Sequence, residues 1–192
     1  RGVRTYISVN SSSKEPEKTV ENEYMDILNM GKIFDREERA RKIVDGMKKQ
    51  IGKAQSEAKA TGRRPRGLIV ELQGKSLTVY GKKTLAGNIL ESMGGELLVP
   101  DFREISKEQL IELNPDALFV VVIENNYDKA DQILSYFYDE KAFDSVNCVR
   151  NHRICVLPLY SIYSAGVRMS DGINFIGKGL YPDLFRDQPG FT

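Results

Sequence analysis

The sequence has few of the residues that would mark a specialised class of protein. It holds two cysteines, Cys148 and Cys155, too few for a disulfide framework, and we expect both to be small buried apolar residues. The longest apolar run, residues 117–123, is far too short to span a membrane. With 28 Lys and Arg against 27 Asp and Glu, the net charge is +1, so no basic field favours nucleic acid. A chain of 192 residues is nevertheless long enough to bury a core without metal or disulfides.

Catalytic motifs are also missing. There is no G-x-G-x-x-G motif after a strand, no Walker A motif and no G-x-S-x-G motif. The single histidine, His152, falls in an expected turn, where a general base is poorly held. Cys148, His152 and Cys155 are metal-ligand types at close spacing, but Cys155 falls in an expected strand and no fourth ligand is near. We therefore expect neither a metal site nor enzyme activity, and we expect His152 to be exposed.

Apolar periodicity predicts one long amphipathic helix over residues 36–61. Asp35 is its expected N-cap, and Gly62 followed by Pro65 predicts its end. At 1.5 Å per residue the helix is about 38 Å long, more than a small domain usually needs. A shorter helix that stops at Gly31 is expected just before it.

From residue 66 onward, segments predicted as strands alternate with segments predicted as helices. In chain order they are strand 68–72, helix 84–93, helix 106–114, strand 117–123, helix 128–138, strand 153–157 and helix 166–180. This order predicts an α/β fold with a doubly wound, mostly parallel sheet, a Rossmann-like lobe behind a long linker helix. The expected organisation is a short N-terminal segment 1–19 with a strand at 5–9, a linker-helix region 20–65, and a C-terminal α/β lobe 66–192.

Tyrosines and one arginine follow the predicted strands, at the sheet edge where open α/β folds bind ligands. Tyr160, Tyr163 and Arg168 come after the last strand, and they offer aromatic rings and a planar cation that binds carboxylate, catecholate or phosphate oxygens. Tyr80 and Tyr127 follow the other two strands, so we expect them at the same edge. Without further context, tyrosines such as Tyr160 and Tyr163 are more often partly buried core residues.

A capped helix leads directly into the central strand. Ser106 and Gln109 have the spacing of a capping box, and Glu108 lies in the first turn, where the helix dipole favours a carboxylate. From the residues alone, Glu108 is explained by this dipole effect on a solvated face.

Several segments resemble a known family, the extracytoplasmic solute-binding proteins that feed ABC importers of ferric siderophores, haem and cobalamin. In that family one long rigid helix joins two lobes. The similar segments are the linker-helix entry 28–34 and 36–40, a helix end at 87–95, a second-lobe signature at 106–116, and the turn and closing helix at 149–154, 164–168 and 180–185. The resemblance spans residues 20–186 and matches only the linker helix and the second lobe of the family.

This resemblance implies a binding module rather than an enzyme. The implied ligand is an iron-siderophore-type chelate, or haem or cobalamin, held in an interlobe cleft by Arg168, Tyr160, Tyr163, Tyr80 and Tyr127. No intrinsic cofactor is implied. Two alternatives stay open, namely a metal-chelate-handling enzyme of the chelatase or nitrogenase-like architecture, and a structural half-domain that oligomerises.

The resemblance also implies partners and a location. Glu108 falls where the family places a glutamate that docks against arginines of the membrane permease. The implied location is extracytoplasmic, in the periplasm or lipid-anchored at the cell surface. The family's first, N-terminal lobe has no counterpart in the sequence, so we expect a processed or cut chain. We also expect its linker helix to expose an apolar stripe and the chain to self-associate.

Overall fold

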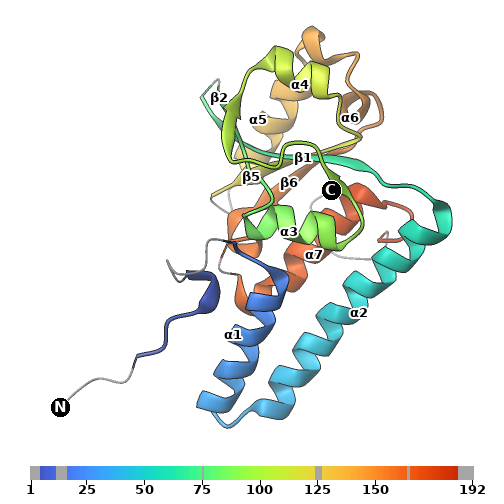
Figure 1. Ribbon diagram of the computed structural model, residues 1–192. Coiled ribbons are helices and arrows are strands. Elements are labelled where there is room, and N and C mark those ends of the chain that lie inside the picture. The colour runs from blue at the N-terminus through green and yellow to red at the C-terminus, as the bar shows by residue number, and fades with distance from the viewer. Residues whose placement is uncertain (1–4, 12–16, 75, 124–126, 164, 186–192) are drawn as a thin grey trace.

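A computed structural model of the protein describes residues 5–11, 17–74, 76–123, 127–163 and 165–185, and it has the predicted α/β fold (Figure 1). The helices are α1 Val20–Ile33, α2 Glu37–Thr61, α3 Leu85–Ser92, α4 Lys107–Leu113, α5 Tyr127–Tyr138, α6 Asn147–Arg150 and α7 Met169–Leu180. The strands are β1 Arg66–Gln73, β2 Ser76–Val79, β3 Glu96–Leu97, β4 Arg103–Ile105, β5 Ala117–Val122 and β6 Ile154–Pro158. Short 3-10 turns are η1 Val9–Ser11, η2 Lys141–Phe143, η3 Leu159–Ser161 and η4 Gly166–Arg168.

One mixed sheet forms the centre of the molecule, in the order β4-β2-β1-β5-β6. β1, β5 and β6 are parallel, as predicted, and β3 adds a short parallel pairing to the start of β1. The sequence analysis missed β2 and β4, which form an antiparallel ribbon beside β1. The parallel part places the carboxyl ends of β1, β5 and β6 at a single edge.

Helices cover both faces of this sheet. Alternate side chains of β5 enter different cores, because successive residues of a strand point to opposite faces. Phe119 and Val121 pack with α1, α2, α3 and α7, whereas Leu118 and Val120 pack with α4 and α5. Figure 1 shows the result as layers, with α4, α5 and α6 above the sheet and α3 and α7 below it. The unbroken apolar run of β5 follows from this double burial.

Helix α2 forms where the periodicity predicts it. Its buried residues recur at helical spacing, namely Ala40, Val44, Met47, Ile51, Ala54 and Ala58. It ends at Gly62, whose φ of 65° lies in the left-handed region that glycine adopts freely. The predicted N-cap was wrong, since Asp35 lies in the preceding turn and Arg36 takes the cap position without a side-chain bond. Among the described residues, no helix combines the length and apolar character that a membrane crossing needs.

Helix α1 continues past the predicted stop at Gly31 and ends at Ile33. Gly31 serves the packing of two helices instead, because a Cβ there would lie 2.5 Å from the Cβ of Ala40 on α2. The amide of Arg36 also donates to the carbonyl of Gly31 at 2.7 Å, which closes the turn between the helices. This close approach sets α1 alongside α2.

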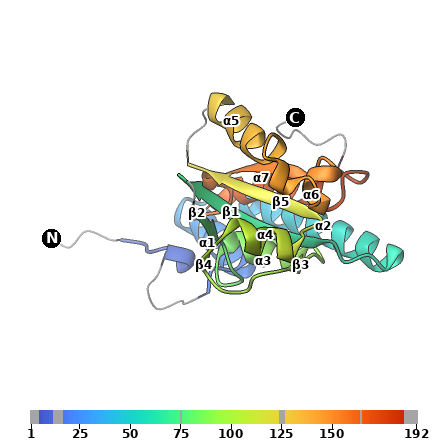
Figure 2. The same cartoon turned by 90° about the horizontal axis from the view of Figure 1, so that it is seen from above.

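The strand predicted at residues 5–9 is absent. Residues 5–8 are irregular and precede η1, and Figure 2 shows this segment projecting from the body on the side of β2 and β4. A strand needs a neighbour for its backbone groups, and here the amide of Val9 donates to a carboxylate oxygen of Asp26 at 2.8 Å instead. The segment is therefore held by α1 rather than by a sheet.

Candidate functional site

The carboxyl ends of the three parallel strands lie level with one another. Glu71 of β1 is in register with Val121 of β5, and Val122 is in register with Pro158 of β6. We call these strand ends and the residues that follow them the rim. Ile123, the next residue after β5, is 68% exposed. Open α/β sheets bind ligands at this edge, so the rim is the candidate binding surface.

Tyr160 and Arg168 come together at the rim, as expected. Tyr160 lies in η3 and Arg168 ends η4, and the guanidinium carbon is 4.3 Å from the centre of the tyrosine ring. The Nε atom of Arg168 donates to a carboxylate oxygen of Asp171 at 2.6 Å. The bond to Asp171, and then the interaction with Tyr160, raise the pKa of Arg168. The site thus presents a permanent planar cation lying on an aromatic face.

Tyr80 follows the antiparallel strand β2, so its backbone lies beside Ile69, and its side chain reaches the rim at Glu71. Its hydroxyl donates to a carboxylate oxygen of Glu71 at 2.7 Å, and its ring meets Phe102 edge-on with centres 5.9 Å apart. Burial, together with the bond to Glu71, raises the pKa of Tyr80, so its phenol keeps the proton at neutral pH. Tyr163 interacts electrostatically with Tyr80 and is itself 68% exposed. Two of the predicted tyrosines, Tyr80 and Tyr163, therefore lie near each other, and Tyr80 binds a carboxylate that the sequence analysis did not select.

The remaining predicted tyrosine, Tyr127, begins α5, and its side chain lies outside the described part of the chain. Glu71 and Phe102 were missed. Glu71 had a signal, because it is the only charged residue in the predicted strand 68–72. Phe102 had none, since it lies in the loop between β3 and β4 where no periodic pattern exists.

Glu108 is placed by the predicted capping box at the start of α4. The amide of Gln109 donates to the Ser106 hydroxyl at 3.2 Å, and the Gln109 side chain accepts from the Ser106 amide at 2.9 Å. Glu108 is exposed, and a hydrogen bond from the Ser106 side chain lowers its pKa. It presents a fixed anion on the helix layer that lies across the sheet from α1 and α2 (Figure 1).

The cysteines and the histidine occupy unreactive positions. Burial raises the pKa of Cys148 to about 12 and that of Cys155 to about 11, so neither is a thiolate at neutral pH. His152 is exposed in the predicted turn, and its ring centre lies 5.4 Å from that of Tyr138. Within the described ranges, no three His, Cys, Asp or Glu side chains gather closely enough to hold a metal.

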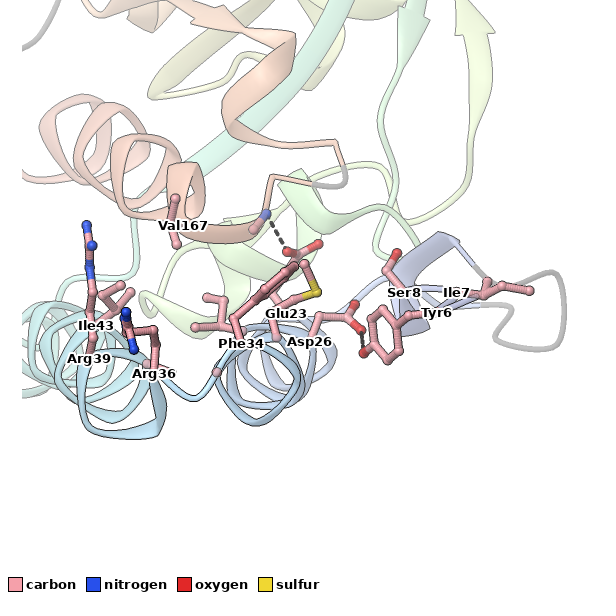
Figure 3. A pocket seen from close by; sticks show the side chains of 15 residues that line it. Tyr6, Ile7, Ser8, Glu23, Asp26, Phe34, Arg36, Arg39, Ile43 and Val167 are labelled. Atoms are coloured by element: carbon pink, nitrogen blue, oxygen red, sulfur yellow. Dashed lines mark hydrogen bonds between the residues drawn. The ribbon is translucent and has the colours of Figure 1, made fainter. Parts of the chain in front are cut away.

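A large hollow lies in the described part of the chain. It is an apolar groove of about 760 Å³ between the N-terminal segment, α1, α2 and η4 (Figure 3). Exposed apolar residues line it, namely Tyr6, Ile7, Met30, Phe34 and Val167. Two buried carboxylates, Glu23 and Asp26, form part of its wall.

The groove corrects one expectation. The apolar stripe of the linker helix is not exposed, because α1 and α7 cover it within the chain. The unpartnered apolar surface lies instead at the end of α1 and in the turn to α2, where Phe34 is 62% exposed. Sequence periodicity does not reveal this surface, since it combines residues from four separate segments.

Known proteins with a similar sequence or structure show which family shares this architecture. A family model described as "Periplasmic binding protein" matches residues 7–160. The crystal structure of a periplasmic binding protein from Veillonella parvula superimposes with a TM-score of 0.90 at 34% identity, covering 97% of this chain and 58% of that one. The petrobactin-binding protein YclQ from Bacillus subtilis superimposes with a TM-score of 0.68 at 22% identity, covering 84% of this chain and 59% of that one.

The curated proteins include a further relative, an uncharacterised ABC transporter substrate-binding lipoprotein, YvrC, of Bacillus subtilis. It is 22% identical over 170 residues, which are 85% of this chain and 51% of the relative. The chain belongs to the periplasmic binding protein family. It spans 51–59% of the length of the three relatives named above.

Proposed function

We propose that this chain is the linker helix and second lobe of the substrate-binding component of an ABC importer. The rim would form one side of a cleft that holds a bulky metal chelate of the ferric siderophore type. The stacked pair of Tyr160 and Arg168 carries this proposal, since aromatic faces and a fixed planar cation suit large conjugated ligands with oxygen donors. The chelate is the transported cargo and not a cofactor, and the proposal includes no catalytic step.

The opposite side of the cleft belongs to a first lobe. Relatives of this chain are longer by about the size of one lobe, and we propose that such a lobe packs into the groove beside α1. The apolar lining of the groove supports this, because exposed apolar patches of this kind mark interaction surfaces. The likeness to a substrate-binding lipoprotein also supports an extracytoplasmic location for the whole protein.

Arg168→Ala tests the ligand role in the protein that carries both lobes. Removing the guanidinium should weaken chelate binding about tenfold or more, because charge-assisted contacts are among the stronger ones in a binding site. Titration with a ferric tris-catecholate, a ferric tris-hydroxamate, haemin and cobalamin would identify the chelate class. Quenching of intrinsic fluorescence reports binding, since tyrosines of this chain lie at the rim.

Arg41→Ala is the matched control. Arg41 is also exposed and bound to a carboxylate, Glu37, at 2.9 Å, but it lies on α2 away from the rim. Its removal should leave chelate affinity unchanged. Equal affinities for the wild type and Arg168→Ala, with any of the four probes that binds, would overturn the ligand assignment.

We further propose that Glu108 docks to the permease. Its exposure and its fixed charge at the start of α4 suit an ion pair that orients two proteins more than it binds them. Glu108→Ala should therefore lower transport of the chelate and leave chelate binding intact. Glu112→Ala, one turn later on the same exposed helix, is the control for a general charge effect. A loss of binding in Glu108→Ala would contradict the docking role.

A further inference from the structure

Glu23 is a buried carboxylate whose two oxygens have different partners. It lies on α1 with 2% of its surface exposed. One oxygen accepts from the side-chain amide of Asn10 at 2.7 Å, and the other accepts from the backbone amide of Gly166 at 2.6 Å, as Figure 3 shows for the second bond. Burying a carboxylate is costly unless it is well bonded, so these two contacts determine what Glu23 does.

The bond to Gly166 acts on the turn that carries Arg168. Gly166 has a φ of 52° and begins η4, which ends two residues later at Arg168. The amide of Arg168 donates back to the carbonyl of Ala165 at 2.9 Å, so η4 is a single closed turn. Fixing the amide of Gly166 therefore fixes the backbone from which the Arg168 side chain reaches the ring of Tyr160.

The bond to Asn10 connects the same carboxylate to the N-terminal segment. Asn10 is buried, and its side-chain oxygen accepts from the amide of Thr19, while its nitrogen donates to the Thr19 carbonyl and to Glu23. The segment 9–11, the start of α1 and η4 thus meet at a single carboxylate. Residues 10, 23 and 166 are far apart in the sequence, and the fold alone brings them together.

We propose that Glu23 is a positioning residue for the rim. From its place on α1, Glu23 holds η4 and thereby sets the position of Arg168. This inference rests on the proposed function for the role of Arg168, but the restraint itself is a property of the chain without ligand. Glu23 does not touch the ligand and acts through the Gly166 amide. The bond from Gly166 to Glu23 consequently joins the rim to the wall of the groove.

Amide exchange in the ¹⁵N-labelled 192-residue chain tests the restraint directly. Glu23→Ala should accelerate hydrogen exchange at Gly166 and Arg168 about tenfold or more, the factor expected when a hydrogen bond to a charged group is lost. Glu23→Gln keeps an acceptor oxygen and nearly the same volume, so it should fold and restore most of the protection. Unchanged exchange at Gly166 in both variants would overturn the proposal.

Asp26→Asn is the matched control. Asp26 lies three residues later on α1, is also buried, and accepts from Tyr6, Val9 and Asn10 rather than from η4. It should leave the exchange of Gly166 at the wild-type rate. A spectroscopic readout separates positioning from general destabilisation, because the Gly166 amide proton shift should follow the ionisation of Glu23 with pH. That titration should vanish in Glu23→Gln and persist in Asp26→Asn; a Gly166 shift that titrates identically in Glu23→Gln would overturn the proposal.

Measurements of chelate binding then test whether the restraint on η4 matters for the proposed function. In the protein with both lobes, Glu23→Gln should weaken binding of the chelate selected above by less than Arg168→Ala does. It should have no further effect once Arg168 has been removed. If the losses of chelate affinity in Glu23→Gln and Arg168→Ala simply added in the double variant, positioning through Arg168 would be contradicted. If no probe binds while the Gly166 exchange still depends on Glu23, the proposed function fails and the restraint on η4 stands.

Discussion

Glu23 and Asp26 are buried carboxylates in a wall that is otherwise apolar. Each has donors for its oxygens, and most of these donors come from the N-terminal segment. The Tyr6 hydroxyl, for example, donates to Asp26 at 2.5 Å. These bonds from the Tyr6 hydroxyl and from Val9 and Asn10 hold the segment against α1. The energetic cost of burying Glu23 makes its effect on stability depend on pH.

Glu23 should make the stability of the chain fall as pH rises. Burial raises its pKa by more than the bonds from Asn10 and Gly166 lower it, and nearby Asp26 adds to the rise. A carboxyl whose pKa is higher in the folded state stabilises fully below its unfolded pKa and loses that contribution as pH rises through the folded value. Urea unfolding between about pH 4 and pH 7 should therefore show a decline in the wild type that is smaller in Glu23→Gln.

The other charged or titratable groups that line the groove with Glu23 are Asp26, Tyr6, Arg36 and Arg39. Burial and the bond to Asp26 raise the pKa of Tyr6, so its hydroxyl stays protonated over this pH range and does not account for the decline. Glu38→Gln is the control, because Glu38 is an exposed glutamate bonded to Lys42 at 2.9 Å. Its stability profile should run parallel to that of the wild type within about 0.5 kcal/mol. A parallel profile for Glu23→Gln would contradict the prediction.

At the scale of helices and strands, the sequence patterns predicted the features that depend on residues close together in the chain. The period of α2, the capping box of α4 and the apolar run of β5 were all read correctly, because each depends on residues close in sequence. β2 and β4 were missed, since each is short and gains its stability from pairing with its neighbours. The pair of Tyr160 and Arg168 was predicted to share an edge, whereas Glu71 and the bond from Gly166 to Glu23 depend on tertiary packing.

The α1–α2 crossing depends on Gly31. Gly31→Ala places a methyl group against Ala40, and backbone atoms of Arg36 and Glu37 lie close behind it. Overpacking at such a contact typically costs about 1–3 kcal/mol, more than the gain in helix propensity returns. The free energy of unfolding in urea should fall by that amount.

Gly46→Ala is the natural comparison for this prediction. Gly46 lies in the middle of α2, and a Cβ there meets nothing within 4 Å. The alanine should stabilise the chain by about 0.5–1 kcal/mol through helix propensity alone. A similar gain of stability in Gly31→Ala would show that α1 and α2 do not need their close approach at Gly31.

At the scale of the whole molecule, the rim and the groove lie on the same side. β1 leaves the end of α2 and runs to the side where α1 and the N-terminal segment lie (Figure 1). A first lobe seated in the groove would therefore stand opposite the rim and would close a cleft over Arg168. The same lobe would cover the wall that contains Glu23. Lobe packing and the position of Arg168 are then physically linked, because Glu23 contributes to both.

The chain without a first lobe should self-associate through the groove. Its apolar lining is unpartnered, and a second copy can cover it at high concentration. Sedimentation velocity over a concentration series should show dimers for the wild type, and Phe34→Ser should reduce them because Phe34 is 62% exposed in this lining. Phe102→Ser removes a similarly exposed ring, 66%, from the surface beside Tyr80 and should leave the dimer fraction unchanged. If both variants dimerise as the wild type does, another surface drives association. If the wild type is monomeric at every concentration, this groove attracts no second copy.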